Sequence, residues 1–158
     1  VPAWSRETSL TLNGENLPIE GTGYQTFTRE WKNGDSLILT LDMRVQTVLP
    51  PEGSCNEEDF CAYRRGPVLL GADARLGKDP EAAFAVKHDT ENIVSGARLT
   101  DCPEIPDARV CVELPTTDGE TVRLIDYSSC GKTWDATSHC AVWLSNGRCE
   151  HVITVTRR

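Results

Sequence analysis

Apolar and polar residues alternate with a period of two along much of this chain, a pattern typical of half-buried β-strands. The clearest case is the segment 36–43, whose apolar positions all fall on one face: Leu37, Leu39, Leu41 and Met43. We expect this apolar face to be buried and Asp42, which lies on the other face, to point to solvent. A slip of one residue would exchange the two faces. On this interpretation, Leu39→Ala costs roughly 2–5 kcal/mol of folding free energy.

Turn-forming residues separate the strand patterns. Asn13-Gly14 follows the segment 9–12 and predicts a hairpin, and Gly66-Pro67 separates strands expected over 60–65 and 68–72. Further strands are expected over 24–31, 45–49, 109–114, 121–125, 139–144 and 152–156. The segment 82–87 is either a strand or one helical turn. Short strands with glycine, asparagine and proline turns predict an all-β chain of one or two antiparallel β-sandwiches.

The composition and net charge of the chain exclude some classes of binding partner. The chain has 158 residues, of which 39% are hydrophobic, and a net charge of −8. Phosphate groups are bound by cationic side chains, so this acidic balance argues against nucleic acid and against an anionic membrane surface. No apolar run approaches the ~18 residues of a membrane-spanning helix. Binding of a neutral ligand such as a sugar is compatible with this charge.

The two ends of the sequence predict a fragment. The chain opens on Val1-Pro2 without an initiator methionine, and it closes inside the strand-like segment 152–156. We therefore expect it to be part of a longer protein, whose cellular location stays unassigned.

Seven cysteines are present, so at least one has no partner within the chain. No Cys-x-x-Cys pair begins a metal site, and no metal-binding residue is assigned. Cys55 and Cys61 flank an acidic loop, where a disulfide is one alternative. Cys111 lies between two valines and is expected to pack as a small hydrophobic residue.

No catalytic residue is assigned either. The chain contains no Gly-x-Ser-x-Gly elbow and no phosphate-binding glycine loop. His139 and His151 fall in expected strands, where an imidazole without a ligand role is the simpler interpretation. Trp134, in an expected loop, is the candidate carbohydrate-binding residue, because an exposed ring can stack on a sugar. Trp143, within 139–144, is expected in the core.

Seven short segments carry a family resemblance when they are taken in order. They are Pro2-Ala3-Trp4, Leu12-Asn13-Gly14-Glu15, Gly23-Tyr24, Arg29-Glu30-Trp31-Lys32-Asn33-Gly34-Asp35, Leu39-Thr40-Leu41-Asp42-Met43, Tyr63-Arg64-Arg65-Gly66-Pro67-Val68-Leu69-Leu70 and Val142-Trp143-Leu144. The chain resembles the C-terminal region of glycoside hydrolase family 127, the β-L-arabinofuranosidase group. The resemblance is dense over 1–73 and sparse over 74–158, and the Trp-x-x-Gly-Asp turn is its most specific part.

The resemblance implies that this chain belongs to a larger enzyme in which a different domain carries out catalysis. In that family an (α/α)6 barrel carries a cysteine nucleophile and a zinc ion held by cysteines and a glutamate, and β-sandwiches follow it. None of those motifs occurs here, so no cofactor is assigned to this chain, and any zinc is expected in the barrel. Residues 1–73 would be the remainder of a first β-sandwich and 74–158 a second. The implied function is that of a non-catalytic accessory region whose partner is the barrel. The alternatives are an independent carbohydrate-binding module and a plain interaction domain.

Overall fold

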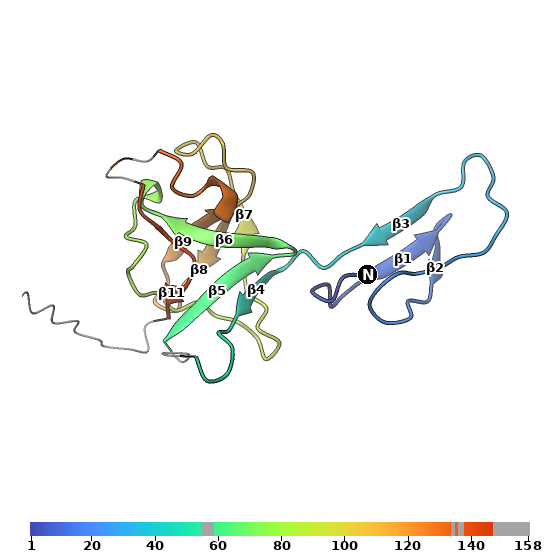
Figure 1. Cartoon of the computed structure of the whole chain (residues 1–158), viewed down its shortest axis with the longest axis horizontal. Helices are drawn as coiled ribbons and strands as arrows, with labels where there is room; N and C mark the ends of the chain where they lie inside the picture. The colour runs from blue at the N-terminus through green and yellow to red at the C-terminus, as the bar shows by residue number, and fades with distance from the viewer. Residues whose placement is uncertain (55–58, 134, 136–137, 147–158) are drawn as a thin grey trace, which may run out of the picture. The chain divides into compact units, whose positions relative to one another are not determined.

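The structure is a computed structural model that describes residues 1–54, 59–133, 135 and 138–146. The described chain consists of antiparallel strands with two short 3-10 turns, Ala74–Leu76 and Tyr127–Ser129. None of its helical segments is long or apolar enough to cross a lipid bilayer. The all-β antiparallel class expected from the sequence is therefore confirmed (Figure 1).

Two compact units make up the chain, Val1–Arg44 and Val45–Arg158. The sequence placed a boundary after residue 73, and the units instead divide after Arg44. Strand β6 (Val68–Asp73) pairs with β9 (Thr121–Asp126) in one sheet of the second unit. Segments on both sides of residue 73 thus belong to the same unit.

The first unit contains a three-stranded sheet in the order β2-β1-β3. Its strands are β1 (Ser9–Leu12), β2 (Glu15–Leu17) and β3 (Leu37–Thr40). Asn13 and Gly14 connect β1 to β2 with φ values of 53° and 86°, the left-handed conformation that a two-residue hairpin turn requires. The predicted Asn-Gly hairpin is confirmed.

The strand expected over 24–31 is wrong, because this segment has no regular secondary structure. Its aromatic residues do not pack as a strand face, since Tyr24 and Trp31 are both exposed. The Gln25 side chain instead accepts a hydrogen bond from the Glu20 backbone amide at 3.0 Å. Local side-chain bonding of this kind competes with a strand ladder.

The expected burial of the segment 36–43 is also wrong. Leu37 and Leu39 do share a face, but their exposed fractions are 42% and 46%, whereas Asp42 is buried at 4%. The regular strand ends at Thr40, so the alternation no longer fixes the direction of Asp42. Since Leu39 keeps much of its surface in water, Leu39→Ala should cost well under the 2–5 kcal/mol expected for a buried leucine.

Asp42 is buried because its polar groups are bonded within the first unit. Its amide donates to Ser5 Oγ at 2.7 Å, and its carboxylate accepts from Arg44 Nε at 2.9 Å and Nη2 at 2.8 Å. The hydrogen bonds from Arg44 lower the pKa of Asp42 from 3.8 to about 2, and burial opposes this only in part. The bond from the Asp42 amide to Ser5 joins the last residues of this unit to its first turn.

We predict that the carboxyl carbon of Asp42 titrates near pH 2 in an NMR experiment. A depressed folded-state pKa means that the stabilisation is complete above the unfolded value of 3.8 and is lost as the pH falls toward 2. Arg44→Ala should return the titration toward 3.8, whereas Lys32→Ala, the control at an exposed position of the same unit, should leave it near 2. An Asp42 midpoint close to 3.8 in the unsubstituted chain would contradict the observed pairing.

The second unit is built on an antiparallel sheet whose main strand order is β11-β5-β6-β9-β8-β7. Strand β4 (Val45–Val48) pairs with β5 (Phe60–Arg65), and β7 (Arg98–Leu99) pairs with β8 (Cys111–Pro115). Gly66-Pro67 joins β5 to β6 with Arg65 opposite Val68, as the sequence predicts. The strands expected over 45–49, 60–65, 68–72, 109–114 and 121–125 are therefore confirmed within a residue or two at their ends.

Strands β5 and β6 change partner along their length. Beyond its pairing with β9, β6 pairs with β10 (Cys140–Ala141), and the start of β5 pairs with β11 (Leu144–Ser145). The single strand expected over 139–144 is thus two short strands. The segment 82–87 has no regular strand or helix, and Val86 makes an isolated bridge to Thr116. The strand expected over 152–156 lies outside the described residues.

The core of the second unit lies on this sheet and is mostly aliphatic. Leu70, Leu114, Leu124 and Leu144 are all 0% exposed. Cys111 is buried beside Ile105 and Ile125, so its expected role as a small hydrophobic residue is confirmed. Trp143, expected in the core, is 48% exposed, which corrects that prediction. It precedes Leu144, and the two-residue strand β11 buries only the leucine.

Candidate functional site

The first unit presents an apolar sheet face, called here the leucine face. Cross-strand register places Leu10 opposite Leu39 and Leu17, and Leu12 opposite Leu37, so their side chains share one side. Leu10 is buried, whereas Leu37 and Leu39 remain exposed. An exposed apolar sheet face of this kind is a candidate contact surface.

The Trp-x-x-Gly-Asp turn positions β3 in this sheet. Asp35 accepts hydrogen bonds from the Lys32 amide at 2.9 Å, from Asn13 Nδ2 at 2.8 Å and from Arg29 Nη2 at 3.0 Å. The bonds from Lys32 and Asn13 lower the pKa of Asp35, and the Arg29 charge contributes further. Gly34 has a φ of 96°, which an L side chain rarely adopts. Gly34 and Asp35 together therefore form the turn that leads into β3.

Two further contacts connect this turn to its surroundings. Asn13 Oδ1 accepts from the Ser36 amide at 2.8 Å, which links the β1–β2 hairpin to the start of β3. The Arg29 guanidinium lies 5.1 Å from the centre of the Trp31 ring. The most specific sequence motif is therefore a scaffold that holds the leucine face together, and its chemistry is hydrogen bonding at a turn.

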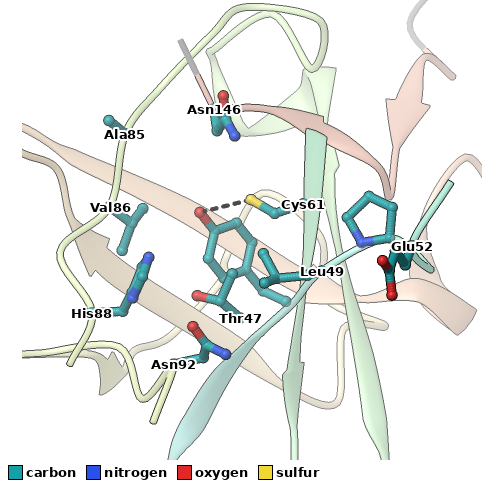
Figure 2. Close-up of a pocket in the computed structure, with 11 residues that line it drawn as sticks. Thr47, Leu49, Glu52, Cys61, Ala85, Val86, His88, Asn92 and Asn146 are labelled. Atoms are coloured by element: carbon teal, nitrogen blue, oxygen red, sulfur yellow. Dashed lines mark hydrogen bonds between the residues drawn. The ribbon is translucent and has the colours of Figure 1, made fainter. Parts of the chain in front are cut away.

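The second unit contains a cavity of about 410 Å3 (Figure 2). Thr47 from β4 and Cys61 and Tyr63 from β5 form one wall, and His88 and Asn92 come from the segment before β7. Cys61 Sγ donates to Tyr63 Oη at 3.4 Å. Burial raises the pKa of Tyr63, so the phenol stays protonated at neutral pH.

The polar groups of this cavity do not form a nucleophile–base arrangement. Cys61 is 4% exposed and bonded to a neutral phenol, which does not favour the thiolate that nucleophilic attack needs. His88 Nδ1 lies 3.1 Å from the carbonyl oxygen of Asp89. The buried Thr47 hydroxyl has no hydrogen-bond partner among the described residues, so one polar group of the cavity wall is unsatisfied there. Over the described residues, no group of three acidic, histidine or cysteine side chains is placed to hold a metal ion.

The candidate residues identified from the sequence do not lie together in the described part of the structure. Trp134, Cys55 and His151 lie outside the described residues, so the stacking role and the Cys55–Cys61 disulfide stay predictions. His139 is exposed, with its Nε2 3.4 Å from Glu81 Oε1. The structure does not bring these residues into one site. Sequence reasoning missed the exposure of the leucine face, whose period-two pattern is the same whether the face is covered or open.

Comparison with protein families gives one match. Residues 1–43 match the model described as the β-L-arabinofuranosidase GH127 middle domain. This range coincides with the first compact unit, so the family signal lies on the leucine face and its supporting turn. The sequence suggested the C-terminal region of that family, and the matched portion is its middle domain. No curated protein matches the chain.

Solved structures of GH127 enzymes resemble this fold. A β-L-arabinofuranosidase from Geobacillus stearothermophilus T6 matches with a TM-score of 0.64 and 18% identity over 92% of this chain and 25% of its own. The GH127 β-arabinofuranosidase BT3674 matches with a TM-score of 0.59 and 19% identity over 88% and 23%, respectively. The chain therefore resembles a β-rich portion of GH127 enzymes and spans about a quarter of their length. At these identities the likeness shows the fold alone.

Proposed function

We propose that this chain is a non-catalytic accessory region of a glycoside hydrolase resembling the β-L-arabinofuranosidases, and that it supports a catalytic (α/α)6 barrel. The observation that carries this proposal is the coincidence of the family match with the first unit, where an apolar sheet face is left open. A sheet face with exposed leucines is normally covered by another layer. The comparisons do not favour an independent carbohydrate-binding module.

In this proposal the leucine face packs against the barrel-bearing part of the parent enzyme. Contacts between domains of one chain cover roughly 600–1,500 Å2 and tolerate a mixed apolar and polar surface. Leu37 and Leu39 supply the apolar centre of such a contact. The opposite face of the sheet carries Ser9, Ile38 and Thr40 by the same register. The matched structures support this arrangement because each is about four times as long as the portion that this chain resembles.

Catalysis and zinc binding belong to the barrel in this proposal. The resemblance assigns the cysteine nucleophile and the zinc ligands to barrel motifs that this sequence does not contain. Among the cysteines of the described chain, Cys61 and Cys111 are buried core residues. This chain would contribute the surface on which the barrel is held and none of the reacting groups.

We predict that the isolated chain self-associates through the leucine face, and increasingly so as salt is raised. The net charge of −8 opposes association at low salt, and added salt screens that repulsion to within about 8–10 Å. Leu39→Asp should restore the monomer in sedimentation velocity at high salt. Leu99→Asp is the matched control, because Leu99 is 59% exposed in the second unit, and it should leave self-association unchanged.

Two outcomes of this experiment would count against the docking face. A monomer at every salt concentration would mean that the exposed leucines need no cover. Equal effects of Leu39→Asp and Leu99→Asp would place the association surface elsewhere. Circular dichroism of both variants should show unchanged strand content, since both positions are exposed.

A further inference from the structure

Two pairs of cysteines meet in the second unit, and the first is Cys130 with Cys140. The Cys130 sulfur lies 2.8 Å from the position that a Cβ would take on Gly71, and the Ala141 carbonyl oxygen lies 3.2 Å from the same point. The Cys140 sulfur lies 3.4 Å from the corresponding position on Gly131, the residue that follows Cys130. Each sulfur is therefore held against the backbone beside its partner.

The surrounding hydrogen bonds fix this first pair. Strand β10 holds Cys140 opposite Asp73 on β6, and the Gly131 amide donates to Asp73 Oδ2 at 3.0 Å. The same aspartate thus organises the backbone next to both cysteines. Burial is the main cause of the raised pKa of Cys130, and the neighbouring Cys140 adds to the rise.

The second pair is Cys102 with Cys111. Antiparallel pairing of β7 with β8 continues past Leu99, where the Thr100 amide donates to the Cys111 carbonyl at 3.0 Å. The chain then turns back, with the Ile105 amide donating to the Cys102 carbonyl at 3.1 Å. Cys102 packs against the small cluster that contains Cys111 and Ile105. Burial raises the pKa of Cys111, and the neighbouring Cys102 adds to the rise.

We propose that Cys102–Cys111 and Cys130–Cys140 are two disulfide sites that form when the chain folds in the presence of a disulfide oxidant. In each pair the fold brings the two cysteines near one another: Cys140 Sγ packs beside Gly131, the neighbour of Cys130, and Cys102 packs against the cluster that contains Cys111. Neither pair involves the GH127-like first unit, so the inference is independent of the proposed function.

The reaction proceeds by thiol–disulfide exchange with a glutathione-type disulfide. One cysteine thiolate attacks the oxidant and forms a mixed disulfide, with release of one small thiol. The second cysteine then displaces the other small thiol and closes the intramolecular bond. Two protons and two electrons leave each pair, and the oxidant is reduced to two thiols.

These bonds are expected to form during folding. Burial raises the pKa of both Cys111 and Cys130 to about 12, so the folded chain holds almost no thiolate at these positions at neutral pH. In the unfolded chain both thiols are exposed to the oxidant. A chain that folds in an oxidising compartment would therefore carry the cross-links, and one that folds among reduced thiols would not.

Peptide mapping of the refolded full chain tests the proposal. The chain is reduced, denatured, refolded with reduced and oxidised glutathione, alkylated and digested with trypsin. Cleavage after Arg109 and Lys132 separates the members of each pair. We expect linked peptides 99–109 with 110–123, and 124–132 with 133–148, and reduction of the refolded chain should lower Tm by roughly 10 °C.

Single variants provide the matched controls. Cys102→Ser should remove only the first link and Cys140→Ser only the second, and both positions are partly exposed, which limits damage to the core. Recovery of all four cysteines alkylated from correctly refolded chain would overturn the proposal, and so would links that cross between the pairs. Neither result would bear on self-association through the leucine face, so the two proposals fail separately.

Discussion

Leu124→Ala is expected to lower the free energy of unfolding of the second unit by about 2–5 kcal/mol. Leu124 lies on β9 opposite Val112 of β8, and both side chains are essentially inaccessible to solvent, with exposed fractions of 0% and 1%. Truncation removes apolar contacts and leaves a cavity in a packed cluster. Since whole domains are stable by only about 5–15 kcal/mol, this loss is a large share of the total.

Urea denaturation followed by circular dichroism measures the effect. Leu99→Ala is the matched control, because Leu99 is 59% exposed on β7 in the same sheet and should change the free energy by about 0.5 kcal/mol or less. Leu39→Ala in the first unit should fall between the two. An unchanged midpoint for Leu124→Ala would show that β9 does not pack as described.

Asp126→Ala is expected to be comparably damaging, with a loss of about 2–5 kcal/mol. The Asp126 carboxylate is buried at the end of β9 and accepts from the Arg109 amide at 2.8 Å, the Val110 amide at 3.1 Å and Ser129 Oγ at 2.8 Å. Alanine leaves these donors without their acceptor. Asp101→Ala, at an exposed position of the same unit, is the control and should be nearly neutral.

The same carboxylate makes stability depend on pH in a definite direction. Burial alone would raise the pKa of Asp126, but hydrogen bonds from Ser128, Val110, Ser129 and Arg109 outweigh it and lower the pKa. Its stabilisation is therefore complete above the unfolded value of 3.8 and is lost as the pH falls below it. The difference between the unsubstituted chain and Asp126→Ala should accordingly shrink below pH 3.8. A difference that persisted undiminished in acid would contradict the charged, hydrogen-bonded state.

Local pattern and turn chemistry were sufficient to predict most strands of the second unit. The residues between β5 and β6 determine where these strands end and begin, because Gly66-Pro67 forms a tight connection. The segments on either side are rich in apolar residues. The Asn13-Gly14 hairpin is equally local. Such elements depend on backbone conformation within a few residues, which the sequence expresses directly.

Other features depend on contacts that no local pattern encodes. Leu37 and Leu39 have the alternation of a buried strand, yet whether a face is covered depends on a second layer. Trp143 lies in an apolar run, but β11 is only two residues long and orients Leu144 inward instead. Cys140 lies beside Gly131, the neighbour of Cys130, because β10 pairs with β6, a contact between distant segments.

The most direct test of the non-catalytic accessory role is hydrolysis of 4-nitrophenyl β-L-arabinofuranoside by the folded chain alone, with zinc and a thiol reductant present. A GH127 β-L-arabinofuranosidase assayed in parallel is the positive control. We predict that release of 4-nitrophenol by this chain stays at the uncatalysed background under every condition. Turnover above background that disappears when one cysteine, such as Cys61, is replaced by serine would contradict the account.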